Sequence, residues 1–412
     1  LTVLTDFAKS HAVSVHSGGG AHVLDLVVES GAPPAQGFFH AVAELAGTRI
    51  FPVSRHPAAL DVVVAGHDNL LRALSWPAAG GAWAASDLPA VGDYVSSPLA
   101  GASRRPGQVD ALLRGSAVGV LGAGWERGGE ALPPWNGWFG LPNLRMMPGN
   151  GFSLVSRDAT KLDAYAVDAD GRAHAAAWDQ NANGAEWDGW WPIVAATSLR
   201  FGRNGTIAGV ARDPTKLDVF AVATGGRPFT AAWDRNDQSG DWRGWWPIAD
   251  SPPALVAGQP LSAVARDATK LDVFAVDARG TVFAAAWDGS AAPAAWQGWW
   301  IVGDAPPPAL PATAVTAVAR DPTKLDLFLA GSDGTVYAAA WDANRAGGSW
   351  RGWWSIAADA KRPRIVPGSP VYAVSRDPAK LDIFAVGVDG GIYSAAYDAS
   401  TNATAWQGWW KL

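Results

Sequence analysis

The stretch Arg266–Asp288, RDATKLDVFAVDARGTVFAAAWD, decides the fold because the chain repeats it. Its first seven residues recur closely at Arg157–Asp163, Arg212–Asp218, Arg320–Asp326 and Arg376–Asp382, and in diverged form at Arg55–Asp61 and Arg104–Asp110. An aromatic residue lies fifteen positions after the closing aspartate of all seven copies, at Trp76, Trp125, Trp178, Trp233, Trp287, Trp341 and Tyr397. This constant spacing indicates a strand, turn and strand whose lengths cannot change.

Each unit predicts four short strands. In the unit that contains Arg266 they are LSAVAR (261–266), LDVFAVD (271–277), TVFAAAWD (281–288) and AWQGWWIV (295–302). These strands are apolar at nearly every position, so both faces of the sheet must be covered. Radial stacking between similar neighbours covers both, which predicts an all-β fold, a β-propeller of seven four-stranded blades. A solenoid of stacked sheets is the alternative.

A tryptophan motif closes the regular units. It reads WDGWW from Trp187, WRGWW from Trp242 and Trp350, and WQGWW from Trp296 and Trp406, with a weaker copy, WNGWF, from Trp135. Neighbouring side chains of a strand point to opposite faces, so one tryptophan of each adjacent pair should face the preceding blade and the other the following blade. Tryptophans on the outermost strand would fill the widening wedge between blades, or form binding surfaces, or do both.

The first residues of the chain do not fit the repeat cleanly. Residues 1–41 resemble the first three strands of a unit but lack its arginine and tryptophans. They are interpreted as a degenerate blade or an N-terminal cap, and residues 42–412 as the seven-bladed propeller. An eight-bladed propeller with a degenerate N-terminal blade stays open.

Composition excludes several classes of function. The 412 residues are 49% hydrophobic and 17% charged, and the net charge of −6 offers no electrostatic footprint for nucleic acid. No apolar run approaches the length that spans a bilayer, so no membrane insertion is expected. The absence of cysteine excludes disulfides and thiol chemistry, and no motif indicates a metal site or a cofactor. The start at Leu1 suggests a processed form, and we expect a secreted or extracellular protein, with the cytoplasm as the alternative.

The repeated arginine and aspartate, such as Arg266 and Asp272, flank the turn between the two inner strands. They could form a buried hydrogen-bonded pair that bridges the turn or reaches the adjacent blade. They could also serve a sugar site, because a tryptophan face accepts the C–H patch of a sugar ring while polar groups bind its hydroxyls. The aspartate of each WD pair, such as Asp288, should cap the loop that follows.

From about residue 50 to residue 412 the units resemble the repeats of bacterial β-propeller lectins of the Photorhabdus type and, more loosely, fungal fucose-binding propeller lectins. The resemblance rests on KLDVFAV, VFAAAWD and WQGWW, and implies binding of fucose or related sugars between consecutive blades. The arginine and glutamate of the fungal sites are absent, since Asp272 and Ala284 stand at those positions. The predicted sugar-binding residues are therefore Trp191, Trp246, Trp300, Trp354, Trp410, Arg157, Arg212, Arg266, Arg320 and Arg376.

The leading hypothesis is thus a non-catalytic lectin with up to five similar sites for monosaccharides or glycans. An enzyme acting on a glycan or a small metabolite is the second hypothesis, because six of the seven histidines fall in the first 67 residues. Its candidate catalytic residues are His16, His22 and His40. A scaffold whose rim or face docks another protein is the third. The oligomeric state stays open.

Overall fold

The protein is described here by a computed structural model. The described residues are 12–17 and 24–29, both for the backbone only, and 49–412 apart from 66–70, 78–81, 89–98, 115–118, 127–134, 143, 148–149, 183–185, 195–197, 203–204, 238–239, 306, 346–347, 357–361 and 402–405.

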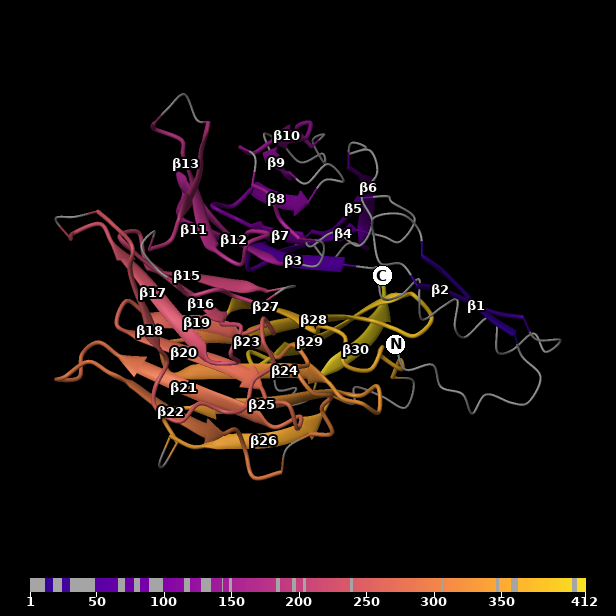
Figure 1. The fold of residues 1–412 in the computed structure, drawn as a ribbon. Coiled ribbons are helices and arrows are strands. Elements are labelled where there is room, and N and C mark those ends of the chain that lie inside the picture. The colour runs from indigo at the N-terminus through magenta and orange to yellow at the C-terminus, as the bar shows by residue number, and fades with distance from the viewer. Residues whose placement is uncertain are drawn as a thin grey trace.

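Seven four-stranded antiparallel sheets form the blades of a propeller, and each blade is built from one continuous segment (Figure 1). Blades 1 to 3 comprise β3 (Arg49–His56), β4 (Ala59–Ala65), β5 (Leu71–Trp76) and β6 (Ala84–Asp87); β7 (Leu99–Ala102), β8 (Gln108–Arg114), β9 (Val120–Glu126) and β10 (Phe139–Gly140); and β11 (Phe152–Asp158), β12 (Lys161–Val167), β13 (Ala173–Asp179) and β14 (Trp187–Pro192). Blades 4 and 5 comprise β15 (Ile207–Asp213), β16 (Lys216–Val222), β17 (Pro228–Asp234) and β18 (Arg243–Pro247); and β19 (Ser262–Asp267), β20 (Lys270–Val276), β21 (Val282–Asp288) and β22 (Trp296–Ile301). Blades 6 and 7 comprise β23 (Thr316–Asp321), β24 (Lys324–Ala330), β25 (Val336–Asp342) and β26 (Trp350–Ser355); and β27 (Tyr372–Asp377), β28 (Lys380–Val386), β29 (Ile392–Asp398) and β30 (Gln407–Lys411).

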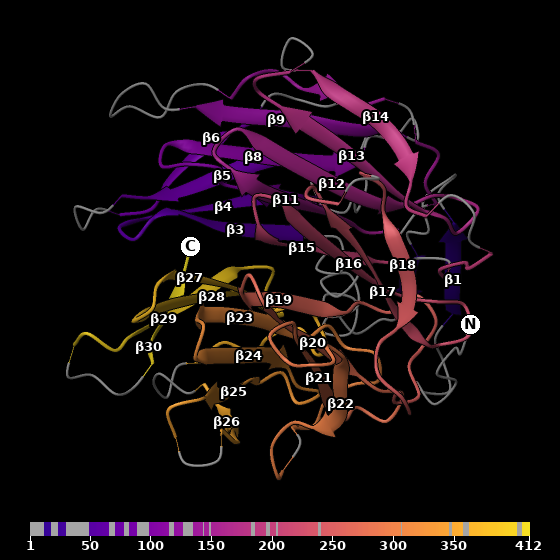
Figure 2. The same ribbon diagram turned by 90° about the vertical axis from the view of Figure 1, so that its left-hand side faces the viewer.

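The ring is closed. The first strands of consecutive blades contact one another all the way round, including β27 of the last blade with β3 of the first. Figure 2 shows the C-terminus beside β3, and Leu412 packs in one hydrophobic cluster with Ile50 of β3. These findings confirm the predicted seven-bladed propeller and exclude the open stack of a solenoid. In the unit of Arg266, the predicted strand ends agree with the structure to within one residue.

The hydrophobic core lies between blades rather than within them. Seven clusters of buried side chains are present among the described residues, and each draws on two neighbouring blades. In blade 5 the second strand is buried at six of its seven positions, because its odd and even side chains face different neighbours. This explains why the strands are apolar without alternation.

Tryptophans hold the outer parts of neighbouring blades together. Trp350 of blade 6 meets the fully buried Phe274 of blade 5 edge to face, with ring centroids 5.6 Å apart and an interplanar angle of 87°. The same contact joins the pairs Tyr165–Trp242, Phe220–Trp296, Phe328–Trp406 and, across the ring closure, Phe384–Trp83. Trp83 therefore takes this role in blade 1, which has no WxGWW motif.

Close backbone packing requires the glycine of the WxGWW motif in blades 4, 5 and 7, at Gly244, Gly298 and Gly408. Gly298 has φ +114°, and a Cβ placed on it would lie 2.8 Å from the carbonyl oxygen of Ala284 and 2.9 Å from the Cα of Ala285. The ladder between β21 and β22 shifts register at this point. Only glycine adopts this conformation and leaves room for the neighbouring strand.

Residues outside the blades include a two-stranded antiparallel sheet of β1 (Ala12–Ser17) and β2 (Leu24–Glu29). Its strands pair with each other and with no blade strand of the described residues. The interpretation of residues 1–41 as a degenerate blade or cap stays a prediction. The described residues contain no helix of the length and apolarity needed to cross a bilayer.

Replacing Phe274 by alanine tests the contact between blades. The side chain is fully buried against Trp350, so the substitution should lower the free energy of unfolding by about 3–5 kcal/mol in urea denaturation. The exposed Val256 is the control, and Val256→Ala should change it by less than about 0.5 kcal/mol. A loss below about 1 kcal/mol for Phe274→Ala would contradict the proposed importance of this contact.

Candidate functional site

The repeated arginine and aspartate form an ion pair in every blade. The Nε–Oδ2 distance is 2.6 Å for Arg266–Asp272 and lies between 2.5 and 2.6 Å in the other regular units. Arg104 and Asp110 pair at 2.9 Å, and Arg55 pairs with Asp61. Side-chain exposure of the regular arginines is only 10–12%, which confirms the expected buried pair across the turn.

The same arginines also reach the following blade. The guanidinium carbon of Arg266 lies 4.8 Å from the ring centroid of Trp341, and Arg104, Arg157, Arg212 and Arg376 lie over the corresponding indoles of Trp178, Trp233, Trp287 and Trp76. In addition, Nη1 donates to a turn carbonyl of the next blade from Arg212, Arg320 and Arg376. The arginine therefore has both of the structural roles considered above: it bridges the turn of its own blade and it contacts the next blade. The aromatic residue fifteen positions after each aspartate is, in five blades, the partner of this cation.

The other polar residues of the repeated turn stabilise the turn itself. Asp267 accepts hydrogen bonds from the backbone N–H of Thr269 at 2.7 Å and from its hydroxyl at 2.8 Å, and it pairs with Lys270. Asp288 accepts from the N–H of Ser290 at 2.8 Å, which confirms the predicted loop cap. Turn geometry thus accounts for the near-identity of RDATKLD among units. The predicted binding role of its arginines stays a prediction.

Burial raises the pKa of the paired aspartates in the five regular blades. It raises the pKa of Asp163 to about 7, against the opposing attraction of the Arg157 guanidinium. Burial likewise raises the pKa of Asp218 and of Asp382 to about 6. These carboxylates face into the protein and are held by arginine, so they are poorly placed to take part in proton transfer with a solvent-borne ligand.

The two adjacent tryptophans of each motif behave differently. The first packs on the preceding blade. In blades 4 to 7 its indole N–H also donates to a carbonyl there, as Trp353 does to Val302 at 2.9 Å. The second is exposed in all five regular blades, at 36% for Trp191, 47% for Trp246, 38% for Trp300, 39% for Trp354 and 48% for Trp410. These five residues are the tryptophans that the sequence singled out for binding.

A crevice of about 580 Å³ lies between blades 3 and 4. Blade 3 contributes Trp191 and the Arg157–Asp163 pair, and blade 4 contributes Trp233 and Trp242. Trp190, by contrast, packs in the cluster between blades 2 and 3. In blade 3 the two adjacent tryptophans thus face opposite neighbours, as predicted. The structure brings Trp191 and Arg157 together at one crevice. The Arg157 guanidinium is also paired with Asp163.

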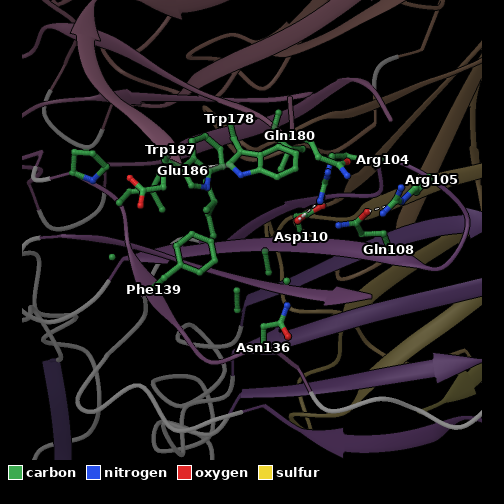
Figure 3. A pocket seen from close by; sticks show the side chains of 18 residues that line it. Arg104, Arg105, Gln108, Asp110, Asn136, Phe139, Trp178, Gln180, Glu186 and Trp187 are labelled. Atoms are coloured by element: carbon green, nitrogen blue, oxygen red, sulfur yellow. Dashed lines mark hydrogen bonds and ion pairs between the residues drawn. The ribbon is translucent and has the colours of Figure 1, made fainter. Parts of the chain in front are cut away.

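A larger crevice of about 830 Å³ lies between blades 2 and 3 (Figure 3). The Arg104–Asp110 pair and Trp178 occupy the positions of their counterparts in the next crevice, and Phe139, 44% exposed, stands where blade 3 has Trp191. Sequence reasoning missed this crevice because WNGWF is an incomplete motif copy. Trp233 and Trp242 also line a crevice, whereas the sequence indicates only that Trp233 marks the strand spacing and that Trp242 packs at the rim.

The histidines of the enzyme hypothesis fall largely outside the described residues. His22 and His40 lie outside them, and His16 is described by its backbone alone, in β1 opposite Asp25. The alternative of a catalytic site there stays a prediction.

Comparisons with solved structures find proteins with a similar fold. No protein-family model matches the chain, and no curated protein matches it. The solved BP39L lectin from Burkholderia pseudomallei is similar over 89% of this chain and 99% of its own, with a TM-score of 0.74 and 23% identity. AofleA from Arthrobotrys oligospora is similar over 77% of this chain and 86% of its own, with a TM-score of 0.54 and 12% identity. The SapL1 lectin, solved with α-methyl fucoside, is similar over 76% and 97%, with a TM-score of 0.50 and 17% identity.

These neighbours agree with the resemblance to propeller lectins that the repeats suggested. At identities of 12–23%, the similarity establishes the shared fold. What the crevices of this chain bind has to be argued from their own residues.

The raised pKa of Asp163 predicts a pH dependence of stability. Between the ordinary value of 3.8 and about 7, the folded state holds a proton that the unfolded state lacks, so the free energy of unfolding falls as pH rises through this window. Relative to Asp163→Asn, the wild type should gain about 1–3 kcal/mol on going from pH 8 to pH 5. Aspartates with a lowered pKa, such as Asp321, do not titrate in this range. Urea denaturation of both proteins at each pH measures this difference. The same change in the free energy of unfolding with pH in both proteins would refute the prediction.

Proposed function

We propose that the protein is a multivalent lectin that binds saccharides in the crevices between consecutive blades. The observation that carries the proposal is the half-exposed second tryptophan, present at the equivalent position of five blades and, in blade 3, lining a crevice with the next blade. These indoles are 36–48% exposed, more than the other rim indoles of the motifs, and a ligand that covers them would remove apolar surface from water. The C–H faces of a sugar ring suit that role.

The polar groups at the crevice support saccharide binding in preference to a purely apolar ligand. In the crevice between blades 3 and 4, Asp241 precedes Trp242 at the mouth, and the Arg157–Asp163 pair lies at the floor. Aromatic walls with a few fixed polar groups are typical of sites for small polar molecules. The propeller lectins with the same fold support the same class of ligand, and α-methyl fucoside is what SapL1 was solved with.

The exposed tryptophan is repeated on five blades, which allows several weak sites to act together. Shallow, solvent-open sites bind a single sugar weakly, while five sites on one rigid ring raise the avidity for a surface rich in glycans without any new contact. A glycan-coated surface implies a protein that acts outside the cell, which we include in the proposal. Fucose or a related monosaccharide is the first ligand to test, with Asp272 and Ala284 replacing the polar pair of the fungal sites.

Calorimetric titration of the chain with fucose, galactose and mannose tests the proposal. At least one of these sugars should bind saturably with a stoichiometry of several sites per chain. A folded protein that binds none of them, nor any member of a glycan array, would refute the proposed function.

The adjacent tryptophans of blade 5 provide a matched pair of variants. Trp300→Ala should weaken binding at one crevice by at least about tenfold, about 1.4 kcal/mol, and so reduce the stoichiometry by one site while stability is kept. Trp299→Ala should lower the free energy of unfolding by about 3 kcal/mol, because this indole packs on blade 4 and donates to Ile248 at 2.9 Å. If Trp300→Ala leaves both the stoichiometry and the affinity unchanged, Trp300 does not contribute to a sugar site.

A further inference from the structure

The crevice between blades 2 and 3 differs from the regular crevices in ways that bear on its ligand. We propose that it is a separate site for a glycan of at least two sugars that carries an N-acetylhexosamine. This inference rests on the proposed lectin function but concerns a crevice outside its five tryptophan sites.

Unpaired donors line one end of this crevice. The Arg104 side chain is 3% exposed, and its Nη1 has no hydrogen-bond partner among the described residues. In three other blades the same atom donates to a turn carbonyl of the next blade, so in blade 2 it is released from that role. Gln108, 7% exposed, accepts from Arg105 Nε at 2.9 Å through its Oε1, and its amide nitrogen donates no hydrogen bond to the described residues. Arg104 Nη1 is a buried donor without an acceptor, and it lies in the same crevice as the Gln108 amide, so a ligand atom that accepts is implied.

The charge around these donors selects a neutral acceptor. The crevice is lined by two cations, Arg104 and Arg105, and by two anions, Asp110 and Glu186. A carboxylate ligand would bring a net negative charge next to Asp110 without a free cation to balance it. A carbonyl oxygen satisfies the donors at no such cost. Leu112 and Leu141 line the same cavity and offer apolar contact for a methyl group. A carbonyl joined to a methyl group is the acetamido substituent.

The opposite end of the crevice has its own polar group. Glu186 is exposed and forms no ion pair or hydrogen bond with the described residues. Figure 3 shows Glu186, Trp187 and Phe139 on one side and Arg104 with Gln108 on the other, with Trp178 between them. Aromatic side chains in the crevice suit stacking of sugar rings, and a carboxylate at the far end accepts from hydroxyls. The volume of about 830 Å³, against 580 Å³ for the next crevice, leaves room for a second sugar ring.

Two disaccharides with the same linkage separate the acetamido contribution from everything else. Calorimetric titration with N,N′-diacetylchitobiose should show one site per chain that binds at least tenfold more tightly than cellobiose, which lacks the acetamido groups. Saturation-transfer NMR should place the acetamido methyl among the most strongly saturated protons. Equal affinities, or chitobiose that fails to bind while monosaccharides occupy the regular crevices, would overturn the inference alone. If no saccharide binds, the proposed function falls and this inference with it.

Substitutions locate the site. Gln108→Met keeps the size of the side chain and removes the amide donor, so chitobiose affinity should fall about 3- to 10-fold. Glu186→Ala, at an exposed position, should lower it similarly and tests the site even if the buried variant fails to fold. Gln297→Met, at an exposed glutamine of blade 5, is the matched control and should leave the affinity unchanged. Unchanged affinity in Glu186→Ala, or an equal loss in Gln297→Met, would refute the assignment.

Discussion

The packing of one blade's indoles on the previous blade's second strand is the interaction on which the structure depends. A single sheet of this sequence exposes apolar side chains on both faces and has no core of its own. Edge-to-face contacts such as Phe274–Trp350 close five of the seven interfaces near the rim, where the blades diverge most. Arginine pairs that reach across to the next indole close the same interfaces at the turn between the inner strands. The proposed function depends on the second tryptophan of each motif, which this packing leaves exposed.

Most of the fold could be predicted from the sequence, because the repeat spacing leaves few choices. Trp287 lies fifteen positions after Asp272, and this spacing holds most of one strand, a tight turn and most of another strand, so the ladder register follows from the count. Opposite faces of a strand also explain why the indoles of Trp353 and Trp354 divide their roles. The role of Trp83 could not be predicted, since it lies outside any motif and acts only after the ring has closed.

The candidate site was predictable in part. The exposed tryptophans follow from strand alternation, but the degree to which Arg266 is occupied does not. Its neighbours Asp272 and Trp341 lie far apart in the sequence, on different blades, so only the assembled ring shows that both are taken. The crevice between blades 2 and 3 is formed by Gln108, Phe139 and Glu186 from separate strands, and none of these belongs to a repeated pattern. A site formed by residues outside the repeat cannot be recognised from the periodicity of the sequence.

The continuity of each blade has a consequence for how such a ring can evolve. Since all four strands of a wedge come from one segment, duplicating a stretch of DNA adds a complete structural unit together with its half of two interfaces. The seam between Phe384 and Trp83 relies on side chains alone, so no strand has to be exchanged when the number of units changes. Once copied, a unit can diversify at its crevice while its turn and rim contacts stay constant. The units near the N-terminus differ most from the repeat, and the crevice between blades 2 and 3 has the most altered lining.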